Sequence, residues 1–156
     1  DILLGAKVFL LDADLLRDHH LDKISGGSVH LLEFGIAEQD MVSAAGGLAL
    51  EGFIPICHSF ACFLTRRANE QIYNNCTEGT HIIYVGTLAG VLPNEIGHSH
   101  EALHDIELMR TMPGMEILTP YTGEEVRNAI RWAVFNTVKP VYIRIPVMPD
   151  VERMRR

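Results

Sequence analysis

The stretch Gly35-Ile36-Ala37-Glu38-Gln39, followed at 41–50 by the small-residue run MVSAAGGLAL, is the most informative part of the chain. Its apolar residues extend nearly all the way round a helix, whereas a surface helix would show a polar stripe. Gly46 and Gly47 each cost about 1 kcal/mol relative to alanine in a helix interior, so a closely packed neighbour is expected beside them. The pattern predicts a buried helix over 37–50, at an interface, with Glu38 in its first turn.

Glu38 has two interpretations from the residues alone. Acidic side chains favour the first turn of a helix, because they complement the helix dipole and the free backbone N–H groups. Glu38 would then be a structural residue. A buried carboxyl group is also a candidate for acid–base chemistry. Other motifs in the chain are needed to distinguish a structural role of Glu38 from a chemical one.

Short apolar runs alternate with helical patterns along the chain, which is typical of a parallel sheet covered on both faces. Strands are expected at 7–11, 30–32, 54–58, 81–85, 116–118 and 141–145, and helices at 37–50, 64–76, 103–112 and 124–136. The predicted fold is an α/β three-layer sandwich with a mostly parallel sheet of about six strands. With 156 residues and no linker or internal repeat, one domain is expected over 1–156.

Composition narrows the classes of function. The net charge is −7, and the basic residues are scattered apart from a short tail at 153–156, which argues against nucleic-acid or anionic membrane surfaces as partners. No apolar run approaches the roughly 18 residues of a membrane span, and no signal peptide is visible. Cys57, Cys62 and Cys76 are odd in number and lack paired-motif spacing. A cytoplasmic protein that acts on small molecules is expected.

Several motifs follow one another in a fixed order over nearly the whole chain. They are FLLDADL at 9–15, GIAEQ at 35–39, SFACFLT at 59–65, RA at 67–68 with EQI at 70–72, SHEAL at 99–103, MR at 109–110 with PG at 113–114, and PVYIR at 140–144. In this order and spacing they resemble the pyrimidine-binding domain of transketolase-like, thiamine-diphosphate-dependent enzymes. The resemblance looks closest to the separately encoded C-terminal halves of split transketolases.

The resemblance implies two catalytic residues. In the family, a carboxyl group bonded to nitrogen N1′ of the aminopyrimidine ring activates thiamine diphosphate, and it must keep its proton, which burial favours. Glu38 stands at that position. His100 matches a histidine that faces the substrate oxygen, where an imidazole can move a proton.

The resemblance also implies contacts with the cofactor. Without the resemblance, two phenylalanines at this spacing would be read as part of a core. With it, Phe63 is expected to stack on the aminopyrimidine, with Phe60 as its support. Ile36 and Asp14 are expected beside the cofactor, and for Asp14 a turn-capping role stays open. Arg66, one helical turn beyond Phe63, is grouped with them, and its role is left open.

His98, His100 and Arg144 are the expected substrate contacts, Arg144 as a phosphate-binding arginine. A metal site formed by His98, His100 and His104 is not expected, because their spacing is loose and no carboxylate or cysteine completes it.

Three positions depart from the transketolase pattern. Ile96 replaces an aspartate that contacts a sugar hydroxyl, Leu88 replaces a histidine that contacts sugar or phosphate, and Asp18 replaces a serine that helps to hold phosphate. A carboxylate at 18 would repel a phosphate group. We therefore expect a donor smaller or less hydroxylated than an ordinary ketose phosphate, such as pyruvate or another 2-oxo acid.

The chain carries one half of the family's cofactor site. It has no Gly-Asp-Gly motif, so the ligands of the diphosphate and its Mg²⁺ are expected on a partner subunit. We expect the family's diphosphate-binding and C-terminal domains to be absent from this chain. The helix that normally precedes the first strand is also missing or not included. Alone, the chain should bind thiamine diphosphate weakly or not at all. A homodimeric or heterotetrameric assembly with a diphosphate-binding subunit is expected, with contact through the helix at 37–50.

The leading hypothesis is a subunit of a thiamine-diphosphate-dependent, transketolase-like transferase that moves a two-carbon ketol or acyl unit. The first alternative is a β-type subunit of a 2-oxo acid acyltransferase or dehydrogenase, whose domain shares the fold, a comparable glutamate and a His-Ser sequence. The second is a non-catalytic scaffold domain. Retention of Glu38, Phe63 and His100 argues against a scaffold, which needs none of them.

Overall fold

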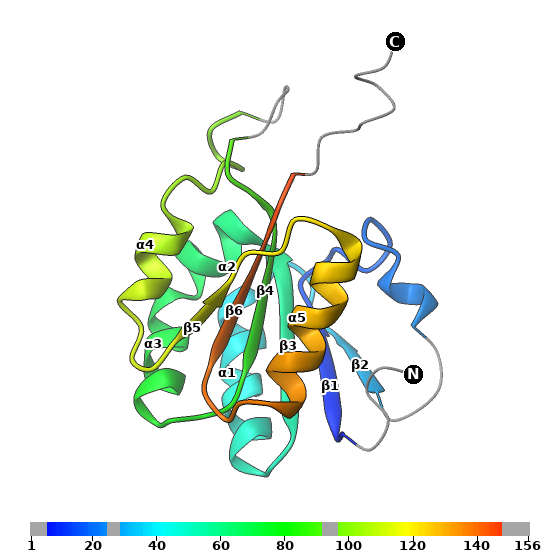
Figure 1. Cartoon of the computed structure of the whole chain (residues 1–156), viewed down its shortest axis with the longest axis vertical. Helices are drawn as coiled ribbons and strands as arrows, with labels where there is room; N and C mark the ends of the chain where they lie inside the picture. Colours follow the sequence, from blue (N-terminus) through cyan, green and yellow to red (C-terminus); the bar gives the residue numbers. More distant parts are fainter. Residues whose placement is uncertain (1–5, 25–28, 92–96, 148–156) are drawn as a thin grey trace.

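The computed structural model describes residues 6–24, 29–91 and 97–147. Its centre is a six-stranded sheet with the order β2-β1-β3-β4-β6-β5, in which every neighbouring pair is parallel (Figure 1). The strands are β1 (Val8–Asp12), β2 (Val29–Glu33), β3 (Ile54–Phe60), β4 (Ile83–Ala89), β5 (Glu116–Leu118) and β6 (Val141–Pro146). The predicted class, α/β with a parallel sheet of six strands, is confirmed.

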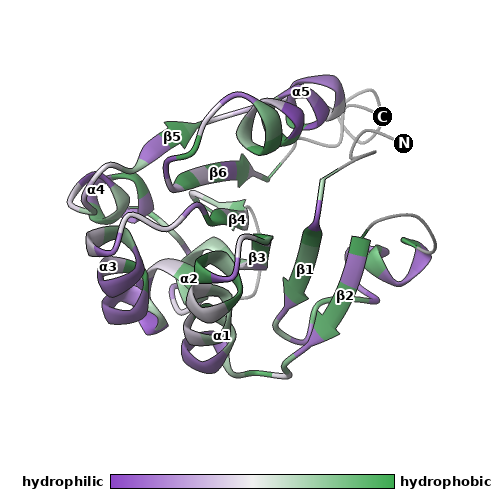
Figure 2. Ribbon diagram, turned by 90° about the horizontal axis from the view of Figure 1, so that it is seen from below, coloured by the Kyte–Doolittle hydropathy of each residue, from purple (hydrophilic) through white to green (hydrophobic). Residues whose placement is uncertain are grey.

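Helices cover both faces of this sheet. They are α1 (Glu38–Leu50), α2 (Ala61–Arg67), α3 (Asn69–Thr77), α4 (Asp105–Arg110) and α5 (Gly123–Phe135), with a short 3₁₀ turn at Leu21–Lys23. Figure 2 shows α1, α2 and α3 together on one side of the sheet and α5 on the other, which makes the predicted three layers. No helix in the described part of the chain has the length and apolarity needed to cross a bilayer.

The strands supply a core on each side of the sheet, because successive side chains of a strand point to opposite faces. Tyr84 and Tyr142 belong to the cluster that packs under α1, α3 and α4. Ile83, Val85 and Ile143 belong to the cluster under α5. All five side chains are buried, so the central strands are held from both sides.

Helix α1 is buried on one side only within this chain. Gly46 faces α3, where the side chain of Asn75 occupies the space that a Cβ would need. Asn75 also donates a hydrogen bond from Nδ2 to the carbonyl of Val42 at 2.9 Å. Gly47 meets no atom within 4 Å and is exposed, as is Ser43 one turn earlier. A close neighbour therefore accounts for Gly46, whereas Gly47 has none among the described residues.

The single helix predicted over 64–76 is wrong. Helix α2 begins at Ala61, directly after β3, and ends at Arg67, and α3 begins at Asn69. The side-chain Nδ2 of Asn69 donates to the carbonyl of Thr65 at 3.1 Å, the carbonyl that the backbone N–H of residue 69 would bond in a continuous helix.

The helix predicted over 103–112 is shorter in the structure. Ala102 pairs with Gly90 in an antiparallel bridge, with backbone hydrogen bonds of 3.0 and 3.1 Å. The chain is extended at this point, so α4 starts only at Asp105. The same bridge ties the loop before α4 to the end of β4.

Candidate functional site

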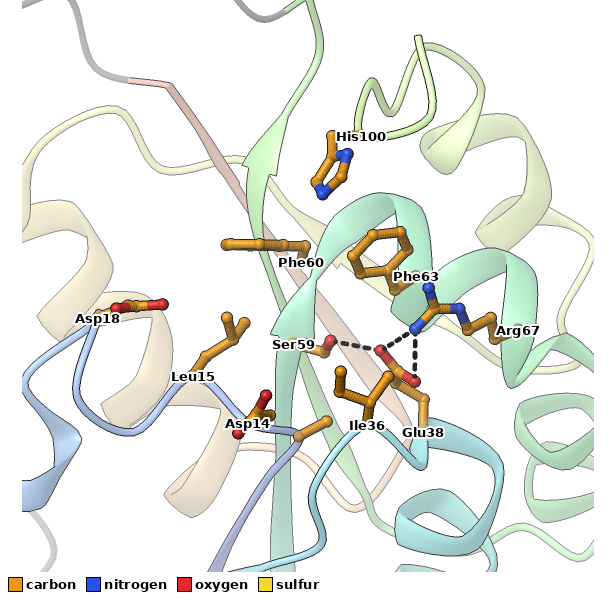
Figure 3. Close-up of a pocket in the computed structure, with 11 residues that line it drawn as sticks. Asp14, Leu15, Asp18, Ile36, Glu38, Ser59, Phe60, Phe63, Arg67 and His100 are labelled. Atoms are coloured by element: carbon orange, nitrogen blue, oxygen red, sulfur yellow. Dashed lines mark hydrogen bonds and ion pairs between the residues drawn. The ribbon is translucent and has the colours of Figure 1, made fainter. Parts of the chain in front are cut away.

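A cavity of about 390 Å³ opens at the carboxyl ends of β1 and β3. Four segments line it: the turn after β1, the turn before α1, the junction of β3 with α2, and the loop before α4 (Figure 3). The lining residues are Ala13, Asp14, Leu15, Asp18, Ile36, Glu38, Ser59, Phe60, Phe63, Arg67 and His100. Open α/β sheets place ligands at this edge. Most of the predicted site residues thus lie around one cavity.

Glu38 is the buried carboxyl group of this cavity, with 3% of its surface exposed. Its Oε1 accepts a hydrogen bond from Ser59 Oγ at 3.1 Å. Both of its oxygens accept from Nη1 of Arg67, each at 3.1 Å. The predicted burial is confirmed. The contact with a permanently charged guanidinium was not predicted.

Arg67 joins Glu38 to the aromatic wall. Its guanidinium carbon lies 3.8 Å from the centroid of the Phe63 ring, a cation–π geometry. The two residues are one turn apart on α2, so their side chains lie on the same helix face. The Arg67 side chain stays 43% exposed. Figure 3 shows it at the side of the cavity, reaching towards the carboxyl group.

Phe60, Phe63 and His100 form one aromatic cluster. The ring centroids lie 6.0 Å apart for the two phenylalanines, 5.0 Å for Phe63 and His100, and 6.2 Å for Phe60 and His100. These tilted and edge-on contacts are the favourable arrangements of aromatic rings. The hydroxyl of Ser99 lies 3.0 Å from Nδ1 of His100. This contact uses Nδ1, so Nε2 is the nitrogen available to a ligand.

Glu33, at the end of β2, ties two turns of the cavity together. Its Oε1 accepts hydrogen bonds from the backbone N–H of Asp14 at 2.8 Å and of Gly35 at 2.7 Å. Both residues adopt left-handed backbone conformations, with φ of 63° and 67°. Such a conformation is uncommon for a residue other than glycine, so Asp14 needs this support. Beside Gly35, the apolar side chain of Ile36 is 72% exposed on the cavity.

A buried acid–base pair lies next to the cavity. Asp12 and His58 are register partners on β1 and β3, with Oδ1 and Nδ1 2.5 Å apart, and Asp12 Oδ2 accepts from the Leu15 N–H at 2.7 Å. Burial alone would raise the pKa of Asp12. The hydrogen bonds from His58 and Leu15 outweigh burial and hold that pKa below its ordinary value.

His19 packs edge-on against the rings of His58, at 4.8 Å between centroids, and Phe60, at 5.7 Å. Burial, together with the nearby His58, lowers the pKa of His19. These contacts connect the aromatic cluster to the end of the sheet.

Three of the predicted site residues do not line the cavity. Arg66 Nη2 donates to the carbonyl of Glu101 at 2.9 Å, so it anchors the loop that carries His100. Arg144 Nε donates to Oδ2 of the buried Asp105 at 2.8 Å. His98 is exposed. Of the positions that depart from the transketolase pattern, Asp18 lines the cavity, Leu88 does not, and Ile96 lies outside the described residues.

The sequence prediction did not include two residues that contact Glu38. Arg67 follows Phe63 by four residues, a spacing that brings a cation over a ring on a helix, and this signal could have found it. Ser59 reaches Glu38 only because β3 lies beside α1. No local pattern could have indicated that contact.

Residues 5–148 of the chain match the family described as the pyrimidine binding domain of transketolase. The chain belongs to this family. Among curated relatives of this transketolase domain, the 6-deoxy-6-sulfo-D-fructose transketolase subunit SqwH of Clostridium sp. (strain MSTE9) is 31% identical over 147 residues, which are 93% of this chain and 45% of that protein. An apulose-4-phosphate transketolase subunit of Actinobacillus succinogenes is 37% identical over 116 residues, 74% of this chain and 37% of that one.

Solved structures of transketolases agree with this assignment. A split gene transketolase, described as an inactive β4 tetramer, superposes with a TM-score of 0.71 at 32% identity, over 90% of this chain and 45% of that one. A transketolase variant from Pichia stipitis has a TM-score of 0.78 over 91% of this chain and 23% of that one, but at 18% identity it supports the fold alone. The chain spans less than half the length of these relatives. Its predicted resemblance to split transketolase subunits is confirmed.

Proposed function

We propose that the chain is the aminopyrimidine-binding part of a thiamine-diphosphate-dependent transferase that moves a two-carbon ketol or acyl unit. The observation that carries the proposal is the buried carboxyl group of Glu38 beside an aromatic wall in one cavity. A flat heteroaromatic ring fits such a site, because Phe63 offers it a ring face and Glu38 a hydrogen-bonding group for a ring nitrogen.

Each side chain of the cavity has a role in this proposal. Glu38 bonds nitrogen N1′ of the aminopyrimidine, and Ser59 orients its carboxyl group through the 3.1 Å hydrogen bond. Ile36 and Phe60 exclude water from the ring, with Asp14 at the cavity's edge. His100 holds or moves a proton at the substrate oxygen through Nε2. When bound, thiamine diphosphate supplies the nucleophilic carbon that accepts the two-carbon unit.

The diphosphate and its Mg²⁺ are proposed to bind a partner subunit. The described residues gather no three His, Cys, Asp or Glu side chains that could hold a metal ion, and hard cations need several oxygen ligands. The relatives named above are subunits, and the split gene transketolase is described as inactive in its β4 form. We propose a homodimeric or heterotetrameric assembly in which the exposed side of α1, with Ser43 and Gly47, contacts another chain.

The charges around the cavity support a donor substrate that places no phosphate group in this cavity. Asp14 and Asp18 line the cavity, and its arginine, Arg67, is paired with Glu38. Arg144 is paired with a buried aspartate. The relatives do not favour the β-type dehydrogenase or the scaffold alternative. Cys57, Cys62 and Cys76 are free and buried, which supports a cytoplasmic location.

The test is a variant of Glu38 in the assembled enzyme. The chain is coexpressed with a candidate subunit that carries a Gly-Asp-Gly motif, and thiamine-diphosphate-dependent consumption of ketose, sulfonated ketose and 2-oxo acid donors is measured. Glu38→Gln should lower turnover about a hundredfold or more, since general acid–base groups contribute on that order. Glu51→Gln, at the exposed opposite end of α1, is the matched control. Unchanged turnover in Glu38→Gln would remove the proposed mechanism.

A further inference from the structure

Arg67 engages the carboxyl group that the proposed function requires for the cofactor. Its Nη1 lies 3.1 Å from each oxygen of Glu38, so one charged donor serves both acceptor atoms. Both oxygens of Glu38 therefore already act as acceptors, whereas a ring nitrogen is itself an acceptor and needs a donor. In this arrangement Glu38 cannot hydrogen-bond N1′ of an aminopyrimidine.

Few described contacts hold the guanidinium of Arg67. It is the last residue of α2, and the helix breaks at Ala68 directly after it. Its side chain is partly exposed, and its described contacts are the Glu38 carboxylate and the face of Phe63. The neighbouring Arg66 has the same charge but is held by the carbonyl of Glu101. Arg66 therefore contacts a backbone carbonyl, whereas Arg67 contacts the carboxyl group of Glu38.

A second hollow lies on the other side of Arg67. Its volume is about 410 Å³, and it is lined by Ile36, Ala37, Glu38, Gln39, Asp40 and Arg67. Glu38 and Arg67 line both this hollow and the cavity described above. Asp40 also lines this hollow and is exposed in the first turn of α1. The hollow thus has open volume beside Arg67 and a second carboxylate in its lining.

We propose that Arg67 is a latch on Glu38. In the free chain it neutralises the buried carboxylate, which would be unfavourable without a partner. When an aminopyrimidine ring enters the cavity, Arg67 moves to Asp40 and leaves Glu38 to the ring nitrogen. This inference rests on the proposed function, and it makes Arg67 a positioning residue that sets the state of Glu38.

The test uses the isolated chain and the fragment 4-amino-5-hydroxymethyl-2-methylpyrimidine, which carries only the ring that this chain is proposed to bind. Binding is followed by NMR shifts of ¹⁵N-labelled protein. Arg67→Met should bind the fragment roughly twofold to fivefold more tightly than the unmodified chain, the range expected for losing a partly exposed ion pair. Asp40→Asn should bind it more weakly by a similar factor. In the Arg67→Met background, Asp40→Asn should have no effect.

Arg127→Met, which changes an exposed arginine of α5 outside the cavity lining, is the control and should bind the fragment like the unmodified chain. Arg67→Gln serves as a second variant if Arg67→Met does not fold. Equal or weaker binding by the Arg67 variants, or no binding by them at all, overturns the latch, since these variants leave Glu38 and Phe63 accessible. The proposed function is tested separately. If Glu38→Gln in the Arg67→Met background binds the fragment as tightly as Arg67→Met alone, Glu38 is not the ring's partner.

Discussion

Asn75 of α3 packs directly on Gly46 of α1, and its Nδ2 bonds the carbonyl of Val42 in the preceding turn. A Cβ at residue 46 would lie too close to Oδ1 of Asn75, so any other residue at this position would force that side chain to shift. This contact fixes α1 against α3, and with it the helix that begins at Glu38.

The two neighbouring glycines of α1 should therefore respond to alanine in opposite directions. Gly46→Ala should destabilise the chain by about 1–3 kcal/mol, because Asn75 must move and its hydrogen bond must weaken. Gly47→Ala should raise the free energy of unfolding by up to about 1 kcal/mol, because nothing lies within 4 Å and alanine favours the helix. Urea denaturation of the isolated chain measures both. A loss of stability in Gly47→Ala equal to that of Gly46→Ala would contradict this packing.

The carboxylate of Glu33 accepts hydrogen bonds from two residues with left-handed backbone conformations, Asp14 and Gly35. Removing this carboxylate should therefore loosen the backbone at these two residues. Glu33→Ala should speed amide hydrogen exchange at Asp14 and Gly35 and lower the stability by about 1 kcal/mol, the usual net contribution of such hydrogen bonds. Glu33→Gln keeps a carbonyl acceptor and should restore most of the protection. If exchange at both amides is the same in Glu33→Ala as in the unmodified chain, the carboxylate does not hold these turns.

The lowered pKa values of His19 and Asp12 predict that the free energy of unfolding decreases in two steps as the pH falls. Burial and the nearby His58 lower the pKa of His19 from 6.5, so the unfolded chain binds a proton there first, and stability falls as the pH drops below about 6.5. The pKa of Asp12 is held below 3.8, so its contribution is present above that pH and is lost as the pH falls through the folded-state pKa. Urea unfolding at a series of pH values measures both steps.

The matched variants for this pH dependence are His19→Asn and His20→Asn. His19→Asn should flatten the upper step, since the half-buried imidazole is gone. His20 is the exposed neighbour, and its replacement should leave the step in place. An upper step of the same size in His19→Asn would assign it to another group.

Local patterns predicted α1 and the burial of Glu38. An apolar helix with an acidic residue in its first turn can be recognised from 16 consecutive residues of sequence. The break between α2 and α3 was not predicted; a side-chain hydrogen bond from Asn69 to the carbonyl of Thr65 accompanies it. The contacts of Glu38 with Ser59 and Arg67 required the tertiary packing of β3, α2 and α1. Residues so far apart in the sequence form no local pattern that would predict their contact.

The motif that contains Arg144 does not predict whether the charge of this arginine is paired with another residue. The motif at 140–144 resembles one with a phosphate-binding arginine, but it does not indicate what else lies near that arginine. In the structure, the buried Asp105 accepts hydrogen bonds from both Tyr142 and Arg144 on one oxygen, each at 2.8 Å. The carboxylate comes from α4, 39 residues away in the chain. Only the fold places it there.

His98 and His100 provide the sharpest comparison within the site, because they are two residues apart and both were predicted to contact substrate. His100 lies in the cavity with its ring 5.0 Å from Phe63, whereas His98 is exposed and outside the lining. In the assembled enzyme, His100→Asn should lower turnover about a hundredfold, while His98→Asn should stay within about twofold of the unmodified enzyme. Steady-state kinetics with saturating thiamine diphosphate measure both variants. Since an imidazole that acts on a proton affects the chemical step, the loss in His100→Asn should fall on kcat more than on KM. Similar losses in the two variants would mean that the loop as a whole, and not the ring of His100, serves the reaction.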